Sequence, residues 1–171
     1  MATITLKPTV CVGTRSGNSP AMKTYPVAAS QTFVKGEAVY LDSNGRVAEF
    51  TTAIDDATQK CLGIAAQDAP TTTGDPVAVY LADPDNLFES NVRSGASAGT
   101  SAIADVGKAF PLVEDATANQ VYVDQNNTAS QGDLANIVAL SKKDAIGDTN
   151  GRVIWHFTDH LSQVAGVSVA T

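Results

Sequence analysis

The clearest pattern of apolar and polar positions lies in residues 61–92, and it predicts three strands joined by a loop and a tight turn. Residues 77–82 have the two-residue period of a strand, with one face more apolar than the other. The more apolar face carries Val77, Val79 and Leu81. Short apolar runs at 61–66 and 87–92 flank this strand, so the segment predicts the order strand, loop, strand, turn, strand.

Two turn signals separate these apolar runs. The first is Asp83-Pro84-Asp85-Asn86, in which proline fixes φ at the second position and the Asp and Asn side chains can bond the amides of the turn itself. The second is Asn44-Gly45, which lies between two apolar runs within residues 33–50 and predicts a β-hairpin, because both residues tolerate positive φ.

The rest of the chain predicts further short strands. A strand pair is expected at 106–113 and 120–124 around a turn at 114–119, with single strands at 136–140 and 152–157. Residues 91–103 are rich in Gly, Ser and Ala and predict a long loop. Residues 51–60 are expected to hold a helical turn, and residues 161–171 an apolar tail that pairs as an edge or reaches a neighbour.

Residues 1–32 differ from the rest of the chain, because their short apolar pieces are broken up by glycine and proline. Such a segment has no core of its own and is ordered only by docking. We therefore predict an extended N-terminal arm at 1–32 and a β domain at 33–171. A disordered solubilising tail is the alternative for residues 1–32.

Composition favours an all-β fold. The chain of 171 residues has 18 valines and 18 threonines against 9 leucines, and β-branched side chains lose rotamer freedom in helices but pack well on sheets. We predict a small β-barrel or β-sandwich domain of roughly eight to ten short strands.

Charge is divided unevenly along the chain, whose net charge is −7. Residues 1–35 hold four basic and no acidic side chains, whereas residues 36–171 hold seven basic and eighteen acidic ones. The four basic residues are Lys7, Arg15, Lys23 and Lys35. They are spread too thinly for a nucleic-acid-binding surface, so they predict instead an arm that lies on an acidic protein neighbour.

Other sequence features exclude several classes of protein. Cys11 and Cys61 predict reduced thiols, since two cysteines in a chain of this length do not form a disulfide framework. No apolar run approaches the roughly 18 residues of a membrane span, and the N-terminus lacks the pattern of a signal peptide. A glycine-rich phosphate loop is also missing, so no membrane association and no nucleotide cofactor are predicted.

Candidate catalytic and metal sites are weak. The segment 95–99 matches the G-x-S-x-G nucleophile elbow with Ser97 at its centre, but an elbow needs a strand before it and a helix after it. His156, Asp159 and His160 would share a face of a helix. The surrounding sequence predicts a strand, on which the two histidines are about 13 Å apart and cannot hold one ion.

Two groups of Asp and Asn side chains also fail as calcium sites, because each lacks the remaining ligands of a calcium loop. They are Asp83 with Asp85, and Asp144 with Asp148 and Asn150. Five aromatic side chains could line a sugar-binding face, although core or cross-strand packing is the plainer interpretation. They are Trp155, Tyr25, Tyr40, Tyr80 and Tyr122. We predict no catalytic residue, no metal and no cofactor.

The run LGIA at 62–65 followed by GDPVAVYLADPDNLFES at 74–90 resembles the capsid decoration, or head cement, proteins of tailed bacteriophages, in which a small β domain carries a similar ADPDxxFE block. The resemblance is clearest over residues 35–92. It continues more thinly through VGKAFPLVED, VYVD and ANIVALSKKDA, and residues 1–30 do not carry it.

This resemblance implies a structural virion protein and not an enzyme. Such a protein is assembled in the host cytoplasm, binds the outer surface of the expanded head as a homotrimer, and stabilises contacts between subunits of the major capsid protein. The basic arm would then leave its own acidic body and lie across a neighbour, so deleting residues 1–30 is expected to weaken attachment and leave the body folded. The alternative is a carbohydrate-binding β module on a virion or cell surface, and an esterase using Ser97 comes third.

Overall fold

The structure is a computed structural model that describes residues 1–50, 54, 60–95, 97–115, 119–126 and 132–158. These residues form thirteen strands and one short 3-10 helix, η1 (Ile103–Asp105), which confirms the predicted all-β fold. The strands are β1 (Val10–Thr14), β2 (Met22–Pro26), β3 (Ala38–Leu41), β4 (Val47–Glu49), β5 (Cys61–Ala65), β6 (Pro76–Leu81), β7 (Asn86–Ser94), β8 (Ser97–Ala98), β9 (Ala109–Phe110), β10 (Leu112–Asp115), β11 (Gln120–Asp124), β12 (Ala135–Leu140) and β13 (Arg152–Phe157).

The larger of two sheets curls towards a closed barrel, and we name it the barrel lobe. Its eight strands follow the order β10-β11-β7-β13-β12-β9, and β1 and β8 also pair with β7. Strands β9 and β10 stand at opposite ends of this order, yet only Pro111 separates them in the chain. The two edges of the sheet are therefore drawn together at one residue, as closure of a barrel requires.

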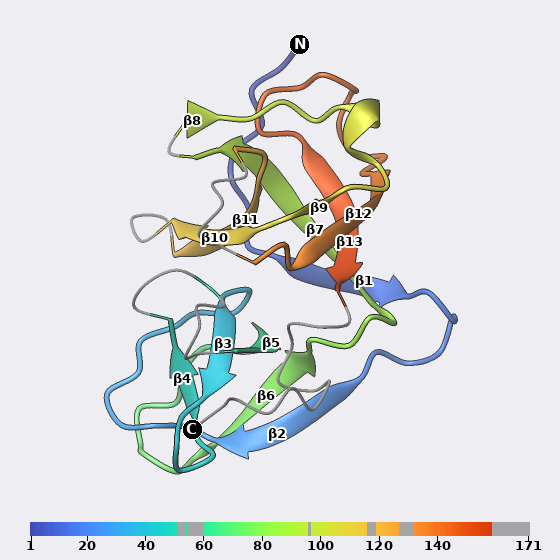
Figure 1. The fold of residues 1–171 in the computed structure, drawn as a ribbon. Coiled ribbons are helices and arrows are strands. Elements are labelled where there is room, and N and C mark those ends of the chain that lie inside the picture. Colours follow the sequence, from blue (N-terminus) through green and yellow to red (C-terminus); the bar gives the residue numbers. More distant parts are fainter. Residues whose placement is uncertain (51–53, 55–59, 96, 116–118, 127–131, 159–171) are drawn as a thin grey trace.

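The second sheet has five strands in the order β2-β6-β5-β3-β4, and we name it the small lobe (Figure 1). Both of its faces are covered. Val77 and Val79 of β6 lie in a cluster on one face, whereas Tyr80 packs against a second cluster on the other. Residues 77–82 can contact both clusters because successive side chains of a strand point to opposite faces of the sheet, as the predicted alternation implies.

The second cluster joins the two lobes into one core. Ala38, Cys61 and Ile64 of the small lobe belong to it together with the aromatic side chains of the barrel lobe. Phe88 stacks on Trp155 with ring centroids 5.0 Å apart, and Phe157 meets the rings of both edge-on. This aromatic group and the aliphatic side chains around it hold the lobes against each other.

Most predicted strands are present. The stretch 61–92 contains β5, β6 and β7 in the expected order, and Asp83 accepts a 2.8 Å hydrogen bond from the amide of Asp85 in the predicted turn. The hairpin within residues 33–50 is β3 and β4, and the last predicted strand at 152–157 matches β13. The helical turn proposed for 51–60 falls largely, and the tail at 161–171 entirely, outside the described residues.

The predicted long loop at 91–103 is wrong in its first half. Strand β7 continues to Ser94, turns at Gly95 and returns as β8. Asn91 has the polar side chain of a loop residue, but it is buried and bonds the amide of Lys7 and the carbonyl of Asn150. Because its polar groups are satisfied inside the fold, the strand runs on through a sequence that indicates a loop.

A separate N-terminal arm is not confirmed. Strand β1 pairs antiparallel with β7 in the barrel lobe, and β2 pairs antiparallel with β6 in the small lobe. The segment is extended, as predicted, but it passes from one lobe of its own chain to the other (Figure 1). Cys11 and Cys61 are free thiols, as predicted. Within the described residues, no helix has the length and apolar character needed to cross a membrane.

Candidate partner-binding groove

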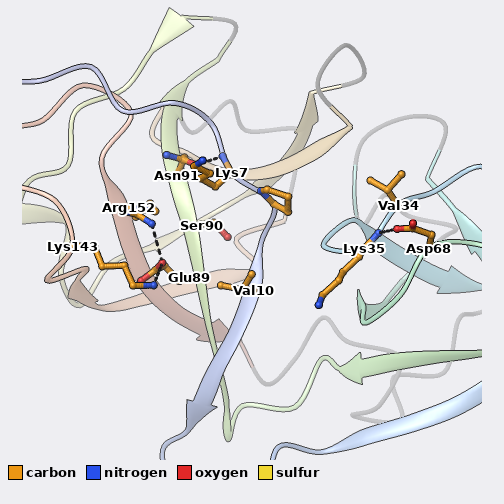
Figure 2. A pocket seen from close by; sticks show the side chains of 11 residues that line it. Lys7, Val10, Val34, Lys35, Asp68, Glu89, Ser90, Asn91, Lys143 and Arg152 are labelled. Carbon is orange, nitrogen blue, oxygen red and sulfur yellow. Dashed lines mark hydrogen bonds and ion pairs between the residues drawn. The ribbon is translucent and has the colours of Figure 1, made fainter.

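A groove of about 580 Å³ lies where the two lobes meet, and we name it the interlobe groove (Figure 2). It is lined by Lys7, Pro8, Val10, Val34, Lys35, Asp68, Glu89, Ser90, Asn91, Lys143 and Arg152. One wall is the start of the N-terminal strand with β7 behind it, and the other is the turn that precedes β3. Both the size and the mixed lining are those of a ligand-binding cleft.

The wall from the small lobe is a tight turn at residues 34–37. The carboxylate of Glu37 accepts a 2.9 Å hydrogen bond from the amide of Val34, and the amide of Glu37 donates back to the carbonyl of Val34 at 3.1 Å. The amide of Lys35 donates to Asp68 at 2.8 Å. These bonds fix the backbone of the turn and leave the Lys35 side chain extended along the groove (Figure 2).

The opposite wall is fixed by buried polar side chains of β7. Asn91 accepts a 2.8 Å hydrogen bond from the amide of Lys7. The hydroxyl of Thr9 lies 2.8 Å from that of Ser90 and donates to the carbonyl of Val121 at 3.0 Å. Thr9, Ser90 and Asn91 are each about 1% exposed, so these bonds are shielded from water and hold the N-terminal segment in place.

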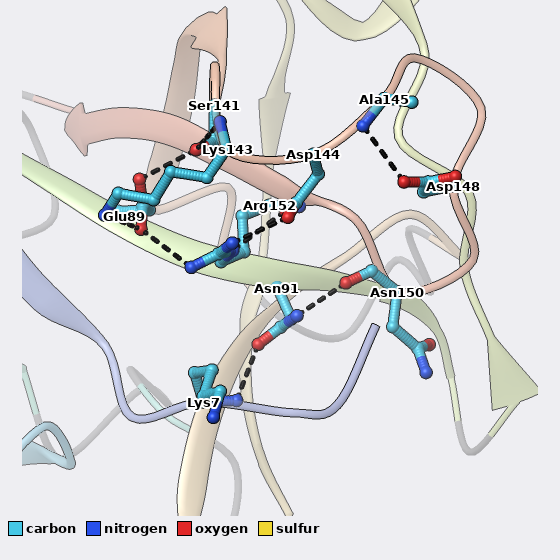
Figure 3. Close-up of polar contacts among 10 residues, drawn as sticks. All are labelled: Lys7, Glu89, Asn91, Ser141, Lys143, Asp144, Ala145, Asp148, Asn150 and Arg152. Carbon is cyan, nitrogen blue, oxygen red and sulfur yellow. Dashed lines mark hydrogen bonds and ion pairs between the residues drawn. The ribbon is translucent and has the colours of Figure 1, made fainter. Parts of the chain in front are cut away.

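A charged network lies on the barrel-lobe side of the groove (Figure 3). Glu89 is 5% exposed and is bonded by Lys143 at 2.8 Å, by Ser141 at 2.9 Å and by Arg152 at 3.4 Å. Arg152 also binds the carboxylate of Asp144 through two N–H groups, at 2.8 and 2.6 Å. The hydrogen bonds from Arg152 lower the pKa of Asp144, because they stabilise its charged form.

The groove is positive although the chain is negative. Among the residues that the structure describes, four basic and two acidic side chains line it, a net charge of +2 on a chain of −7. Lys143 and Arg152 are engaged by carboxylates. The ammonium groups of Lys7 and Lys35 have no hydrogen-bond or ion-pair partner among the residues that the structure describes. These two lysines are therefore the charges that remain for a partner.

Of the four predicted basic residues, the structure brings two together and leaves two apart. Lys7 and Lys35 line the groove from opposite walls. Arg15 lies beside the turn at Asp85, to whose carbonyl it donates its amide at 2.8 Å. Lys23 lies on β2, with its ammonium 5.3 Å from the centre of the Tyr25 ring. The groove accordingly contains half of the predicted set.

Sequence reasoning missed Lys143, Arg152 and Glu89. Glu89 lies more than fifty residues from both Lys143 and Arg152 along the chain, and the pairing of β7 with β13 brings Arg152 next to β7. No local pattern marks such a set. The one available signal is the acidic residue within the apolar run of 87–92, because a carboxylate at such a position needs a cation nearby.

The other candidate sites have different roles in the structure. Ser97 begins β8 and pairs with the end of β7, so the strand–turn–helix arrangement of a nucleophile elbow is not formed there. His156 is buried, with Nδ1 2.8 Å from the carbonyl oxygen of Phe157, and Asp159 and His160 lie outside the described residues. Among the described residues, no group of three or more His, Cys, Asp or Glu side chains is arranged to hold a metal ion.

The predicted aromatic residues face the interior more than the surface. Trp155 is fully buried and donates its indole N–H to Ser90 at 2.9 Å. Tyr122 is 5% exposed and is covered by Arg93, and Tyr40 packs against Phe50 with ring centroids 5.0 Å apart. The rings of Trp155 and Tyr122 are therefore largely covered, whereas Tyr40 is half-buried.

A second surface feature is apolar. Ile103 and Ile146 are 69% and 65% exposed, and Val106 is 40% exposed. All three line a hollow of about 400 Å³ together with Leu140. Exposed aliphatic side chains gathered in one place mark surfaces that contact other molecules.

No protein-family model matches this chain, and no curated protein or solved structure matches it. The function is therefore inferred from the chemistry of these surfaces and from the sequence resemblance.

Proposed function

We propose that this protein is a structural virion protein of the capsid-decoration type. It binds the outer surface of the expanded phage head and stabilises contacts between subunits of the major capsid protein. The observation that carries the proposal is the interlobe groove, where an acidic chain gathers positive charge around two lysines that have no ion-pair partner within the described part of the chain. A groove of this kind favours a protein partner with an acidic surface.

The sequence resemblance supports the same interpretation. Its clearest part, residues 35–92, contains β3 to β6 and most of β7. It also supplies one wall of the groove through Lys35 and Asp68, and part of the other through Glu89, Ser90 and Asn91. The segment that resembles decoration proteins is therefore the one that forms much of the groove.

The proposed mechanism is stabilisation by binding. A protein that binds only the assembled head shifts the equilibrium towards that state by an amount set by its affinity and concentration. Because the two lobes share one close-packed core, which resists deformation, they would act as one rigid unit between capsid subunits. No catalysis is required for this role.

We also propose that the protein assembles as a homotrimer. The apolar hollow around Ile103, Val106 and Ile146 is a surface that a second copy can cover. Sedimentation equilibrium of the free protein and of the Ile103→Lys variant measures the oligomeric state. A trimer that the variant disrupts supports this part, and a protein that is monomeric at all concentrations contradicts it.

Deletion of residues 1–30 is not a usable test of attachment, because it removes a strand from each sheet. The better experiment is co-sedimentation of the intact protein with expanded, undecorated capsids of its own phage, titrated to saturation. We expect saturation at a fixed copy number, in threes at each three-fold position. Failure to bind at concentrations well above those of assembly would overturn the proposal.

A further inference from the structure

We infer that the interlobe groove binds an extended, acidic segment of a partner polypeptide. The identity of the partner as the capsid protein rests on the proposed function. The chemistry of the segment rests on the groove alone.

The position of the charges favours an extended chain. Lys7 and Lys35 come from opposite walls, and the lining also includes the aliphatic side chains of Pro8, Val10 and Val34. Successive side chains of an extended peptide point in opposite directions. Such a peptide can direct carboxylates to the lysines and apolar side chains to the valines at the same time.

The groove is poorly suited to a small anion. The amides of Lys7 and Lys35 already donate to Asn91 and Asp68, so they form no nest of free N–H groups. Two of the four cations are engaged as well, because Glu89 and Asp144 bind Lys143 and Arg152. What remains is two separate ammonium groups, which match separate carboxylates better than one compact ion.

Nucleic acid is disfavoured for a different reason. Asp68 and Glu89 line the same groove as the lysines and would repel a continuous row of phosphates. The described lining residues, eleven in number, include no aromatic side chain on which a base could stack. A polypeptide with isolated acidic residues has no continuous row of charges to be repelled, and it needs no aromatic side chain for base stacking.

The test uses the intact protein and a peptide probe, so it needs no capsid. The probe is an acetylated octapeptide of alternating glutamate and valine, and its neutral match has glutamine in place of glutamate. Amide chemical shifts of ¹⁵N-labelled protein are followed during titration. We expect the glutamate peptide to shift the amides of residues 7, 9–10, 34–35 and 89–91, and to bind more weakly at about 0.3 M salt.

Charge reversal locates the site. The double variant Lys7→Glu with Lys35→Glu should weaken binding by at least about tenfold. The matched control is Arg15→Glu with Lys23→Glu, which changes the net charge equally at two exposed positions outside the groove, and it should stay within about twofold of the unmodified protein.

Three results would overturn the inference: no shifts at millimolar glutamate peptide, equal binding of the glutamine peptide, or equal weakening in the two double variants. The capsid assay separates this inference from the proposed function. Peptide binding in the groove without capsid binding supports the groove chemistry and rejects the decoration function. Full capsid binding by the Lys7→Glu, Lys35→Glu variant supports the function and rejects the groove as its contact.

Discussion

Gly36, in the turn before β3, lies directly against the backbone of Thr9. A methyl group on Gly36 would lie 2.8 Å from the carbonyl oxygen of Thr9 and 2.9 Å from the Cβ of Pro8. The φ of Gly36 is +97°, in the region that favours glycine. Glycine therefore allows the small lobe to approach the N-terminal segment beside the interlobe groove.

Replacing Gly36 with alanine should destabilise the protein by roughly 2–4 kcal/mol, because backbone strain and a steric clash act together. Gly74→Ala is the matched control, since Gly74 has a similar φ of +89° and nothing within 4 Å of an added methyl group. The free energy of unfolding of the Gly74→Ala variant should fall by only about 1 kcal/mol. Urea unfolding measures both, and equal losses would show that the contact with Thr9 is not tight.

The hydroxyl of Thr9 should contribute to the stability of the folded protein. Thr9→Val keeps the shape of the side chain but removes the bonds to Ser90 and to the carbonyl of Val121. Because the site is buried, we expect a loss of about 1–2 kcal/mol in the free energy of unfolding. The exposed Thr72 gives the control, and Thr72→Val should change stability by less than about 0.5 kcal/mol. A Thr9→Val protein as stable as the control would mean that the hydroxyl does not stabilise the N-terminal segment.

The fold was largely predictable from sequence because its central strands carry local signals. Residues 77–82 alternate, and Asp83 bonds the amide of Asp85 as the turn chemistry indicates. The role of residues 1–32 was not predictable in the same way. Their glycines and prolines show that they have no core of their own, but nothing in them identifies β7 and β6 as their pairing partners.

The groove was predictable only in part for the same reason. An excess of basic residues near the N-terminus identified Lys7 and Lys35 as candidates, and it identified Arg15 and Lys23 equally. Which of them meet depends on contacts between distant segments, such as Gly36 with Thr9. Composition predicts that a basic surface exists, whereas topology decides where it lies.

Arg152 should be important for stability because it neutralises two carboxylates. Asp144 and Glu89 have side chains only 4% and 5% exposed, and Arg152→Met leaves both without this cation. We expect a loss of about 2–3 kcal/mol at pH 7, less than for a fully buried pair because solvent reaches part of the guanidinium. Lys108→Met removes a 3.8 Å ion pair with Asp105 in which the lysine is mostly exposed, and it should cost less than about 0.5 kcal/mol.

The loss caused by Arg152→Met should also depend on pH. Arg152 lowers the pKa of Asp144 in the folded protein, so the stability from this group is present above the unfolded pKa of about 4 and is lost as the pH falls through the folded value. The difference between the two proteins should therefore shrink in acid. Unfolding midpoints at pH 7 and at about pH 3.5 test this, and a constant difference would contradict it.

Glu114 on β10 should give the protein the opposite pH dependence. Burial, together with the negative charges of Glu37 and Glu49 in the small lobe, raises the pKa of Glu114 to about 7. Its Oε2 atom is buried without a hydrogen-bond partner among the described residues. The folded protein therefore holds a proton there that the unfolded chain releases near pH 4.3, so stability falls as the pH rises from about 4.5 to 7.

Glu114→Gln should remove this dependence, because glutamine resembles the protonated acid and carries no charge at any pH. The variant should have a melting temperature close to that of the unmodified protein at pH 5 and a higher one at pH 8, where the unmodified carboxylate faces two others across the junction of the lobes. Asp75→Asn, at an exposed position in the loop before β6, removes one negative charge without burial, so its difference from the unmodified protein should be the same at both pH values. A Glu114→Gln variant that follows the pattern of Asp75→Asn would mean that the Glu114 carboxylate is solvated and that the lobes meet without this repulsion.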